Sequence, residues 1–217
     1  LLSENKESNL NDEQVKFAGT IYSSGCDLLA LINEILDLSK VEAGKMPVNP
    51  KAVQLKDVRD YLEQTFRPVA EHKGLEFKIA AGADLPKTLF SDENRLQQIL
   101  KNLLSNAFKF TEKGMVKLDV ELASKERHFP VETLNKAKNV VVFRVSDTGI
   151  GIPSDKQKLI FEAFQQADGT TSRRYGGTGL GLTISREIAR LLGGMIEVES
   201  EPGVGSQFSL FLPQKYT

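Results

Sequence analysis

The sequence predicts an α+β domain, a two-layer sandwich of helices on a mixed sheet, preceded by one long helix. Apolar residues recur at helical spacing over about residues 12–43 and again over 92–111. Strict apolar alternation marks strands at 116–122 and 141–145. Because strands and helices alternate without strict βαβ regularity, the pattern favours helices on one face of a mixed sheet.

The composition is that of an ordinary globular chain and narrows the possible functions. The chain has 217 residues, of which 40% are hydrophobic and 26% charged, which argues against disorder. Its 28 Lys and Arg against 29 Asp and Glu give a net charge of −1, so nothing favours a nucleic-acid binder. The single cysteine, Cys26, excludes a disulfide-stapled scaffold. No run of about 18 apolar residues and no signal pattern is present, so we expect no membrane segment within these residues. We expect them to be cytoplasmic, whether the full-length protein is membrane-anchored or soluble.

The segment at about 12–43 has an apolar stripe broad enough for a helix in a bundle. Such a face needs a partner, either a second copy of the chain or the rest of this chain, and the pattern leaves both open. Gly44 and Pro47 end the helix. We therefore expect residues 1–48 to form a partial helical region and residues 49–217 to form a second domain.

The other elements follow from apolar periodicity and from the residues that typically end helices. In chain order, we expect a helix at 56–73, a strand at 75–80, a helix at 92–111 with Ser91 as its N-cap, strands at 116–122 and 141–145 with a Lys-rich loop at 124–138 between them, a helix at 178–192, and strands at 196–200 and 207–212.

The polar face of the 92–111 helix is the first candidate site. Its members recur at spacings of three and four: Arg95, Gln98, Asn102, Asn106 and Lys109. Asparagine is roughly half a kcal/mol worse than alanine in a helix, so two of them one turn apart require a reason. An amide oxygen suits Mg²⁺, and a lysine one turn on could meet the phosphates that such an ion bridges. Taken alone, this face is better explained as a solvated helix surface.

The second candidate is the segment Asp147–Gly151, directly after an apolar strand. Its glycines allow a ligand to approach the backbone, and a strand-end aspartate can accept a hydrogen bond from an amine. Ser154 stands where the dinucleotide fingerprint requires glycine, so that motif is excluded. By itself the segment could be a simple turn.

The third candidate is the glycine cluster at 176–181, which opens a helix and so offers backbone N–H groups to an anion. Leu182 stands where a Walker A loop has lysine. The polar segment before it, 167–175, carries Arg173 and Arg174 and predicts a mobile lid. A flexible linker is the alternative.

Together, these motifs resemble the catalytic and ATP-binding domain of a two-component sensor histidine kinase, with its N, G1, F and G2 boxes in order. The resemblance covers about residues 54–213. Residues 31–44 resemble the end of the family's second dimerisation helix, and 171–177 resemble the glycine lid of the hybrid type. The resemblance implies a Bergerat-type fold, as in gyrase and heat-shock chaperones, with ATP and Mg²⁺ as cofactors.

The resemblance also assigns roles to individual residues. They are Asn106 as Mg²⁺ ligand, Asn102 as support for the ion or its waters, Lys109 on phosphate, Asp147 on the adenine amine, Gly149, Gly151, Ile152 and Ser206 around the base, Gly177, Thr178, Gly179, Leu180 and Gly181 around the phosphates, Arg173 or Arg174 at the γ-phosphate, and Phe161 with Phe164 as lid anchors.

One feature of the family is absent from the sequence. The phosphoacceptor histidine motif does not occur, and His72 and His128 lie in unrelated segments. The chain opens on Leu1, so we expect it to be part of a longer protein whose acceptor histidine lies upstream. By resemblance, its partners are a second copy, joined through the N-terminal helix, and a receiver domain.

Three other functions share the same motifs. The first is an ATP-hydrolysing clamp of the gyrase or chaperone type, but such relatives carry a water-activating glutamate where Asn102 stands. The second is a serine kinase that restrains a sigma factor, which should lack the bundle helix. The third is a nucleotide-binding scaffold without catalysis, which the complete set of boxes disfavours.

Overall fold

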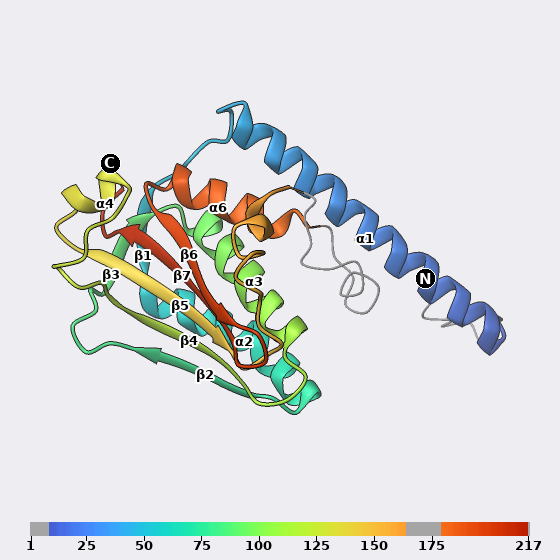
Figure 1. Ribbon diagram of the computed structural model, residues 1–217. Coiled ribbons are helices and arrows are strands. Elements are labelled where there is room, and N and C mark those ends of the chain that lie inside the picture. Colours follow the sequence, from blue (N-terminus) through green and yellow to red (C-terminus); the bar gives the residue numbers. More distant parts are fainter. Residues whose placement is uncertain (1–8, 164–178, 217) are drawn as a thin grey trace.

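The computed structural model describes residues 9–163 and 179–216. In these residues a five-stranded sheet carries its three long helices on one face, and a further helix runs along the outside (Figure 1). The elements are α1 (Asp12–Glu42), β1 (Lys51–Gln54), α2 (Leu55–Lys73), β2 (Glu76–Ala81), β3 (Thr88–Ser91), α3 (Glu93–Phe110), β4 (Met115–Leu122), α4 (Glu132–Lys136), β5 (Val140–Asp147), a 3₁₀ turn (Leu159–Phe161), α6 (Gly181–Leu191), β6 (Met195–Glu201) and β7 (Gly205–Pro213).

The main sheet has the strand order β2-β4-β5-β7-β6, in which β2 and β4 are parallel and the other pairs are antiparallel. The predicted α+β sandwich on a mixed sheet is therefore confirmed. Sequence analysis missed the separate two-stranded sheet of β1 and β3, because each of these strands is only four residues long.

The register of the sheet decides which side chains face the helices. Val145 on β5 lies opposite Phe208 on β7, and Phe208 lies opposite Val198 on β6. Directly opposed residues point to the same face of a sheet, so these three form one row under α3 and α6. Because side chains alternate along each strand, every second row continues this core.

The opposite face of the sheet is covered at one end by the connection between β4 and β5. This segment was expected to be a loop, but it contains the short helix α4. Its apolar side chains form a second, smaller core with the outer residues of β5 and β7: Phe129, Leu134, Val140, Val142 and Phe211.

Helix α3 begins one residue later than expected. The predicted N-cap, Ser91, is still paired with Lys51 in the small sheet. Asp92 caps the helix instead: its carboxylate accepts a hydrogen bond from the Arg95 backbone N–H at 3.1 Å and another from the Asn49 N–H at 2.8 Å. Asp92 therefore joins the start of α3 to the segment that follows α1.

Helix α1 has the predicted bounds to within a residue and packs against α6. Leu38 on its inner side belongs to the main core. The structure thus supports packing on the rest of the chain for this side of the helix. The proposed domain division between residues 48 and 49 stays a prediction.

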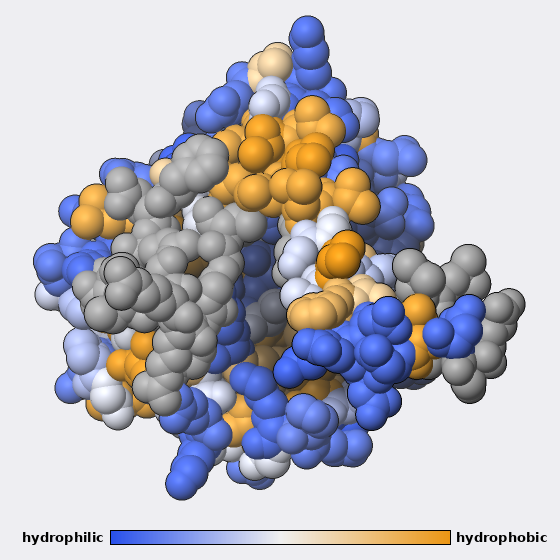
Figure 2. Space-filling view, turned by 90° about the vertical axis from the view of Figure 1, so that its right-hand side faces the viewer, coloured by the Kyte–Doolittle hydropathy of each residue, from blue (hydrophilic) through white to orange (hydrophobic). Residues whose placement is uncertain are grey.

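The outer side of α1 exposes a long series of apolar side chains. Figure 2 shows a band of apolar side chains on the face of the molecule along which this helix runs. The exposed members are Phe17, Ile21, Tyr22, Leu28, Leu29, Ile32, Ile35 and Leu36.

Among the described residues, α1 is the one helix that is long and apolar enough to cross a membrane, judged by length and composition alone. Core helices of soluble proteins and signal sequences pass the same test. The expectation that no segment qualifies is therefore not confirmed.

Candidate functional site

The polar face of α3 divides into two parts with different partners. In the first half of the helix, Gln98 donates a hydrogen bond from Nε2 to the Asp37 carboxylate of α1 at 2.9 Å. Arg95 lies 3.9 Å from the same carboxylate and donates to Gln98 Oε1 at 2.8 Å. These two residues hold α1 against the domain. Only the second half of the helix is left to form a ligand site.

Asn102 lies where the second half begins and faces the start of α6. Its Nδ2 donates to Ser185 Oγ at 2.9 Å. A Cβ on Gly181 would lie 2.4 Å from Asn102 Oδ1, so any larger residue at this position would displace the Asn102 side chain. The side-chain amide nitrogen is used by Ser185, and the oxygen faces the first turn of α6.

Asn106 and Lys109 follow on the same face, and both side chains are half-buried. Burial lowers the pKa of the Lys109 ammonium below its ordinary value of 10.5. The ammonium also lies 5.0 Å from the centre of the Phe110 ring. A partly desolvated cation beside an amide suits an anionic ligand, since its attraction for phosphate is less screened by water.

Asp147 is the last residue of β5, and its side chain lies on the same face of the sheet as the apolar rows of the core. It lies opposite Ser206 on β7, which lies opposite Ser200 on β6. We call these three side chains the polar row. The Asp147 carboxylate accepts hydrogen bonds from the backbone N–H group of Gly149, at 2.8 Å, and from that of Ser206. Burial raises the pKa of the Asp147 carboxyl above its ordinary 3.8, although the two N–H groups counteract part of this effect.

The loop after Asp147 closes onto the turn between β6 and β7. Gly151 has φ 69°, and a Cβ there would lie 2.0 Å from the Glu201 carbonyl oxygen. The Gly203 N–H donates to the Ile150 carbonyl at 2.8 Å. The loop also adjoins the end of α3, because the Ile150 N–H points to the Phe110 carbonyl at 3.3 Å. The loop that follows the strand-end carboxylate thus adjoins the end of the helix that carries the two amides.

Phe161, the predicted lid anchor, lies in the 3₁₀ turn and is buried. Its carbonyl accepts a hydrogen bond from Thr183 Oγ1 at 2.9 Å, and its ring packs edge-on against Phe208. This residue therefore joins α6 to the core. Leu180, just before α6, is fully buried, while Gly179 beside it has φ 74°.

Several predicted site residues lie outside the described residues. They are Phe164, the lid segment at 167–175 with Arg173 and Arg174, and Gly177 with Thr178.

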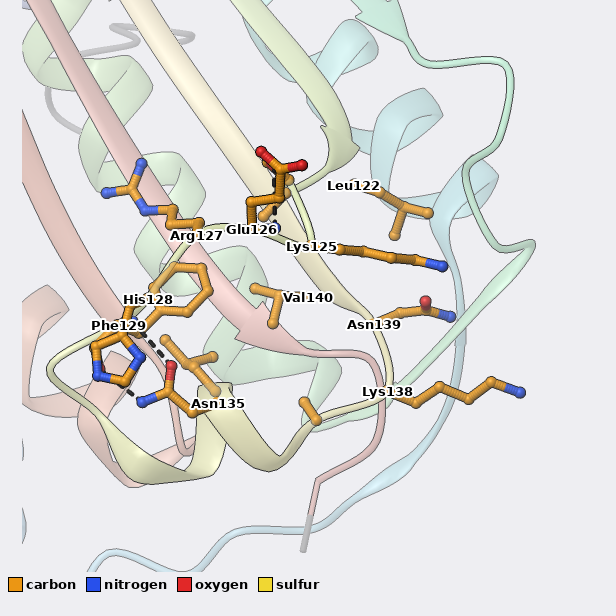
Figure 3. Close-up of a pocket in the computed structure, with 14 residues that line it drawn as sticks. Leu122, Lys125, Glu126, Arg127, His128, Phe129, Asn135, Lys138, Asn139 and Val140 are labelled. Atoms are coloured by element: carbon orange, nitrogen blue, oxygen red, sulfur yellow. Dashed lines mark hydrogen bonds between the residues drawn. The ribbon is translucent and has the colours of Figure 1, made fainter.

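A cavity of about 420 Å³ lies at the other end of the sheet, within the β4–β5 connection (Figure 3). It is distant from the polar row, because it is lined by the end of β4 and the start of β5. Lys125 and Lys138 point away from His128 rather than toward a common centre (Figure 3). Asn135 closes its wall by two hydrogen bonds to the Phe129 backbone. The cavity therefore does not bring these side chains together into a catalytic or ligand-binding arrangement.

Three residues that contact the site were missed by sequence analysis. Ser185 bonds to Asn102 across 83 residues of chain, a separation that no local pattern reveals. Ser200 and Gln157 join the loop after Asp147 to β6. Ser200 could have been noticed, since it continues the inward positions Ile196 and Val198 with a polar residue.

A model of the family described as "Histidine kinase-, DNA gyrase B-, and HSP90-like ATPase" matches residues 91–216. The chain belongs to this family. Its match includes the second half of α3, the polar row and the start of α6, which are the parts that form the site.

Curated relatives show which members of the family this chain resembles. The autoinducer 2 sensor kinase/phosphatase LuxQ of Vibrio cholerae is 39% identical over 208 residues, covering 96% of this chain and 23% of LuxQ. The sensor histidine kinase GacS of Pseudomonas protegens is 41% identical over 213 residues, covering 96% and 22%. The chain thus spans about a quarter of the length of these relatives.

Solved structures of histidine kinases have the same fold as this chain. Full-length ShkA in complex with AMPPNP superposes with a TM-score of 0.79 at 32% identity, over 98% of this chain and 41% of ShkA. The histidine kinase AdeS of Acinetobacter baumannii shares the fold, with a TM-score of 0.71 at 19% identity, over 95% of this chain and 86% of AdeS. The identification as the catalytic domain of a sensor histidine kinase is confirmed.

The close approach at Gly151 is testable against a matched glycine. Gly151 and Gly203 both have positive φ, so alanine at either position costs about 1–2 kcal/mol. Only at Gly151 would the Cβ meet backbone, whereas nothing lies within 4 Å at Gly203. We expect Gly151→Ala to lose a further ~1–3 kcal/mol in the free energy of unfolding, measured by urea titration. Equal losses in the two variants would contradict the close approach.

Proposed function

We propose that this chain is the ATP-binding catalytic core of a two-component sensor histidine kinase. It transfers the γ-phosphoryl group of Mg-ATP to a histidine on a segment outside the 217 residues, for relay to a receiver-domain aspartate. One observation supports the proposal: the loop after the buried Asp147 carboxylate adjoins the end of α3, and Asn102 of the same helix adjoins the first turn of α6.

The base of the nucleotide is assigned to the Asp147 end of this region. The carboxylate is an acceptor set in a buried row, and an adenine amino group is a donor. Ser206 lies opposite it, Gly149 and Gly151 belong to the loop that follows it, and Ile152 of the same loop bonds to Ser200 in the polar row.

The phosphates are assigned to the other end, between α3 and α6. Backbone N–H groups at the start of α6, from Gly179 to Gly181, favour an anion. Gly177, Thr178 and an arginine at 173 or 174 would complete this end. Lys109 supplies a partly buried positive charge.

Magnesium fits the amides rather than a carboxylate cluster. Within the described residues, no group of three or more His, Cys, Asp and Glu side chains could hold a metal. The Asn106 amide oxygen would be a ligand, and Asn102 Oδ1 would hold the ion or one of its waters, because Asn102 Nδ2 is bonded to Ser185. When bound, the ion would neutralise phosphate charge during transfer.

Asn102 also favours phosphoryl transfer to histidine over ATP hydrolysis. An amide cannot take a proton from water, whereas a neutral imidazole nitrogen is already a nucleophile. The curated relatives are named sensor kinases, which supports this choice over the gyrase or chaperone clamp.

The partners follow from α1 and from the reaction. The exposed apolar band of α1 fits a second copy of the same helix in a homodimer, since it cannot be buried within one copy. The phosphohistidine product requires a receiver domain as acceptor. We further propose that the reaction takes place in the cytoplasm, which supplies ATP.

Removing the Asn106 amide should reduce the magnesium dependence of ATP binding. We expect Asn106→Ala to bind ATP more weakly than wild type in Mg²⁺, and the two proteins to bind similarly when EDTA is present. Calorimetry with and without Mg²⁺ measures both values. Ser105→Ala, an exposed neighbour on the same helix, is the matched control. Unchanged affinity in Asn106→Ala would remove this residue from the site.

The chain should prefer ATP over GTP through Asp147. Guanine offers a carbonyl where adenine has an amine, so the buried carboxylate would be left unpaired, and GTP should compete ~10²-fold less well or worse. Because burial raises the pKa of Asp147, ATP binding should begin to weaken above pH 3.8 as the pH falls. Competition for a labelled nucleotide measures both effects. Asp155→Asn removes an exposed carboxylate instead and, as the control, should behave like wild type. Equal competition by GTP would refute the assignment.

The 217-residue chain should bind ATP without phosphorylating itself. Both histidines are exposed and neither lies on α1: His72 lies in the last turn of α2, and His128 lies in the β4–β5 connection. Transfer requires reacting atoms about 3–3.5 Å apart, which neither position provides for.

Incubation with γ-labelled ATP tests this prediction against two comparison proteins. A protein extended upstream to include the acceptor helix should be labelled, and a His72→Ala/His128→Ala double variant should behave like the parent chain. Acid-labile label on the parent chain that disappears in the double variant would show that the phosphoryl group goes elsewhere.

A further inference from the structure

The hydroxyl of Ser200 has all its hydrogen-bonding capacity used inside the protein. It lies 2.9 Å from the Gly205 carbonyl oxygen, 2.8 Å from the Ile152 backbone nitrogen and 2.9 Å from Ser206 Oγ. A hydroxyl has one proton to donate and two lone pairs to accept with. Three partners therefore saturate it.

The chemistry of these partners fixes the direction of each bond. A carbonyl can only accept, so the Ser200 proton goes to Gly205. A backbone N–H can only donate, so Ile152 uses one lone pair of Ser200. The contact with Ser206 must then use the second lone pair, and Ser206 is the donor.

This arrangement leaves Ser206 without a proton for a ligand. Ser206 lies opposite Asp147 in the polar row, and the Asp147 carboxylate also only accepts. Toward a bound base, both groups are therefore acceptors. An exocyclic amino group has two protons to offer them, whereas an oxo group at the same position offers none.

Gln157 supports the geometry without touching Ser206. Its Nε2 donates to the Ile152 carbonyl at 3.0 Å and to the Ser200 carbonyl at 2.8 Å. It thereby holds the loop after Asp147 against β6, at the place where the Ile152 N–H meets Ser200.

We propose that Ser200 is a positioning residue that determines specificity: by taking the Ser206 proton, it makes the polar row select a 6-aminopurine over a 6-oxopurine. The inference rests on the proposed nucleotide site and adds to it a residue that need not contact the ligand. Gln157 acts as a support for the loop alone.

Competition of ATP and inosine triphosphate for a ribose-labelled fluorescent ADP tests the proposal, because the two nucleotides differ at the 6-amino or 6-oxo group. Losing one hydrogen bond of this kind corresponds to about a threefold to tenfold change in affinity. We expect Ser200→Ala to lower the ATP-to-ITP preference by that factor, and Ser200→Thr, which keeps the hydroxyl, to restore it. Ser209→Ala is the matched control and should leave the preference unchanged, because this buried serine lies opposite Arg144 on the face of β7 that points away from the polar row.

Gln157→Ala separates proton direction from loop rigidity. It should weaken both nucleotides in parallel, so that their ratio stays as in wild type. A ratio that falls as far as in Ser200→Ala would overturn the proposed role of the proton. If Ser200→Ala does not fold, as judged by thermal melting, Ser200→Cys replaces it, since a thiol of similar size is a weak acceptor.

The outcomes also separate this inference from the proposed function. A wild-type chain that binds ATP and ITP equally well, or neither, would overturn the nucleotide assignment itself. A wild-type chain that prefers ATP, together with a folded Ser200→Ala or Ser200→Cys variant of undiminished preference, would overturn only the role of Ser200.

Discussion

The burial of α3 is the constraint on which the site depends. Its apolar face lies entirely in the core, at Leu96, Ile99, Leu100, Leu103, Leu104, Ala107 and Phe108. This burial fixes the rotation of the helix about its axis, so the amides one turn apart on the opposite face can point in only one direction. The start of α6 approaches that face closely because Gly181 has no side chain. The amides are therefore positioned by the packing of residues that take no part in the chemistry.

The sheet supplies the second half of the site by the same principle. The rows of β5, β7 and β6 are apolar beneath the helices, and the row at their end becomes polar at Asp147, Ser206 and Ser200. The strand register places these three side chains next to one another, although they come from separate parts of the chain. Backbone groups hold the Asp147 and Ser200 side chains, and the Ser200 hydroxyl in turn holds that of Ser206, which makes the row rigid before any ligand arrives.

Helix α3 also connects the site to α1. Arg95 and Gln98 hold Asp37, while Asn102 on the next turn holds Ser185. The polar face of α3, which sequence analysis treated as one surface, thus contacts two different helices, α1 and α6. A movement of α1 relative to the domain would break contacts one helical turn away from the proposed metal ligands.

The sequence by itself determined the long helices, the five strands of the main sheet and the order of the motifs, because periodicity and glycine placement are local properties. It could not show that Arg95 and Gln98 bind α1, that Asp92 rather than Ser91 caps α3, or that α4 covers the second face. Nor could it reveal the bonds from Ser185 and Ser200, since these join residues that only the packed fold brings together. Tertiary structure decided these points because side-chain partners depend on register and helix rotation, which are set by the whole core.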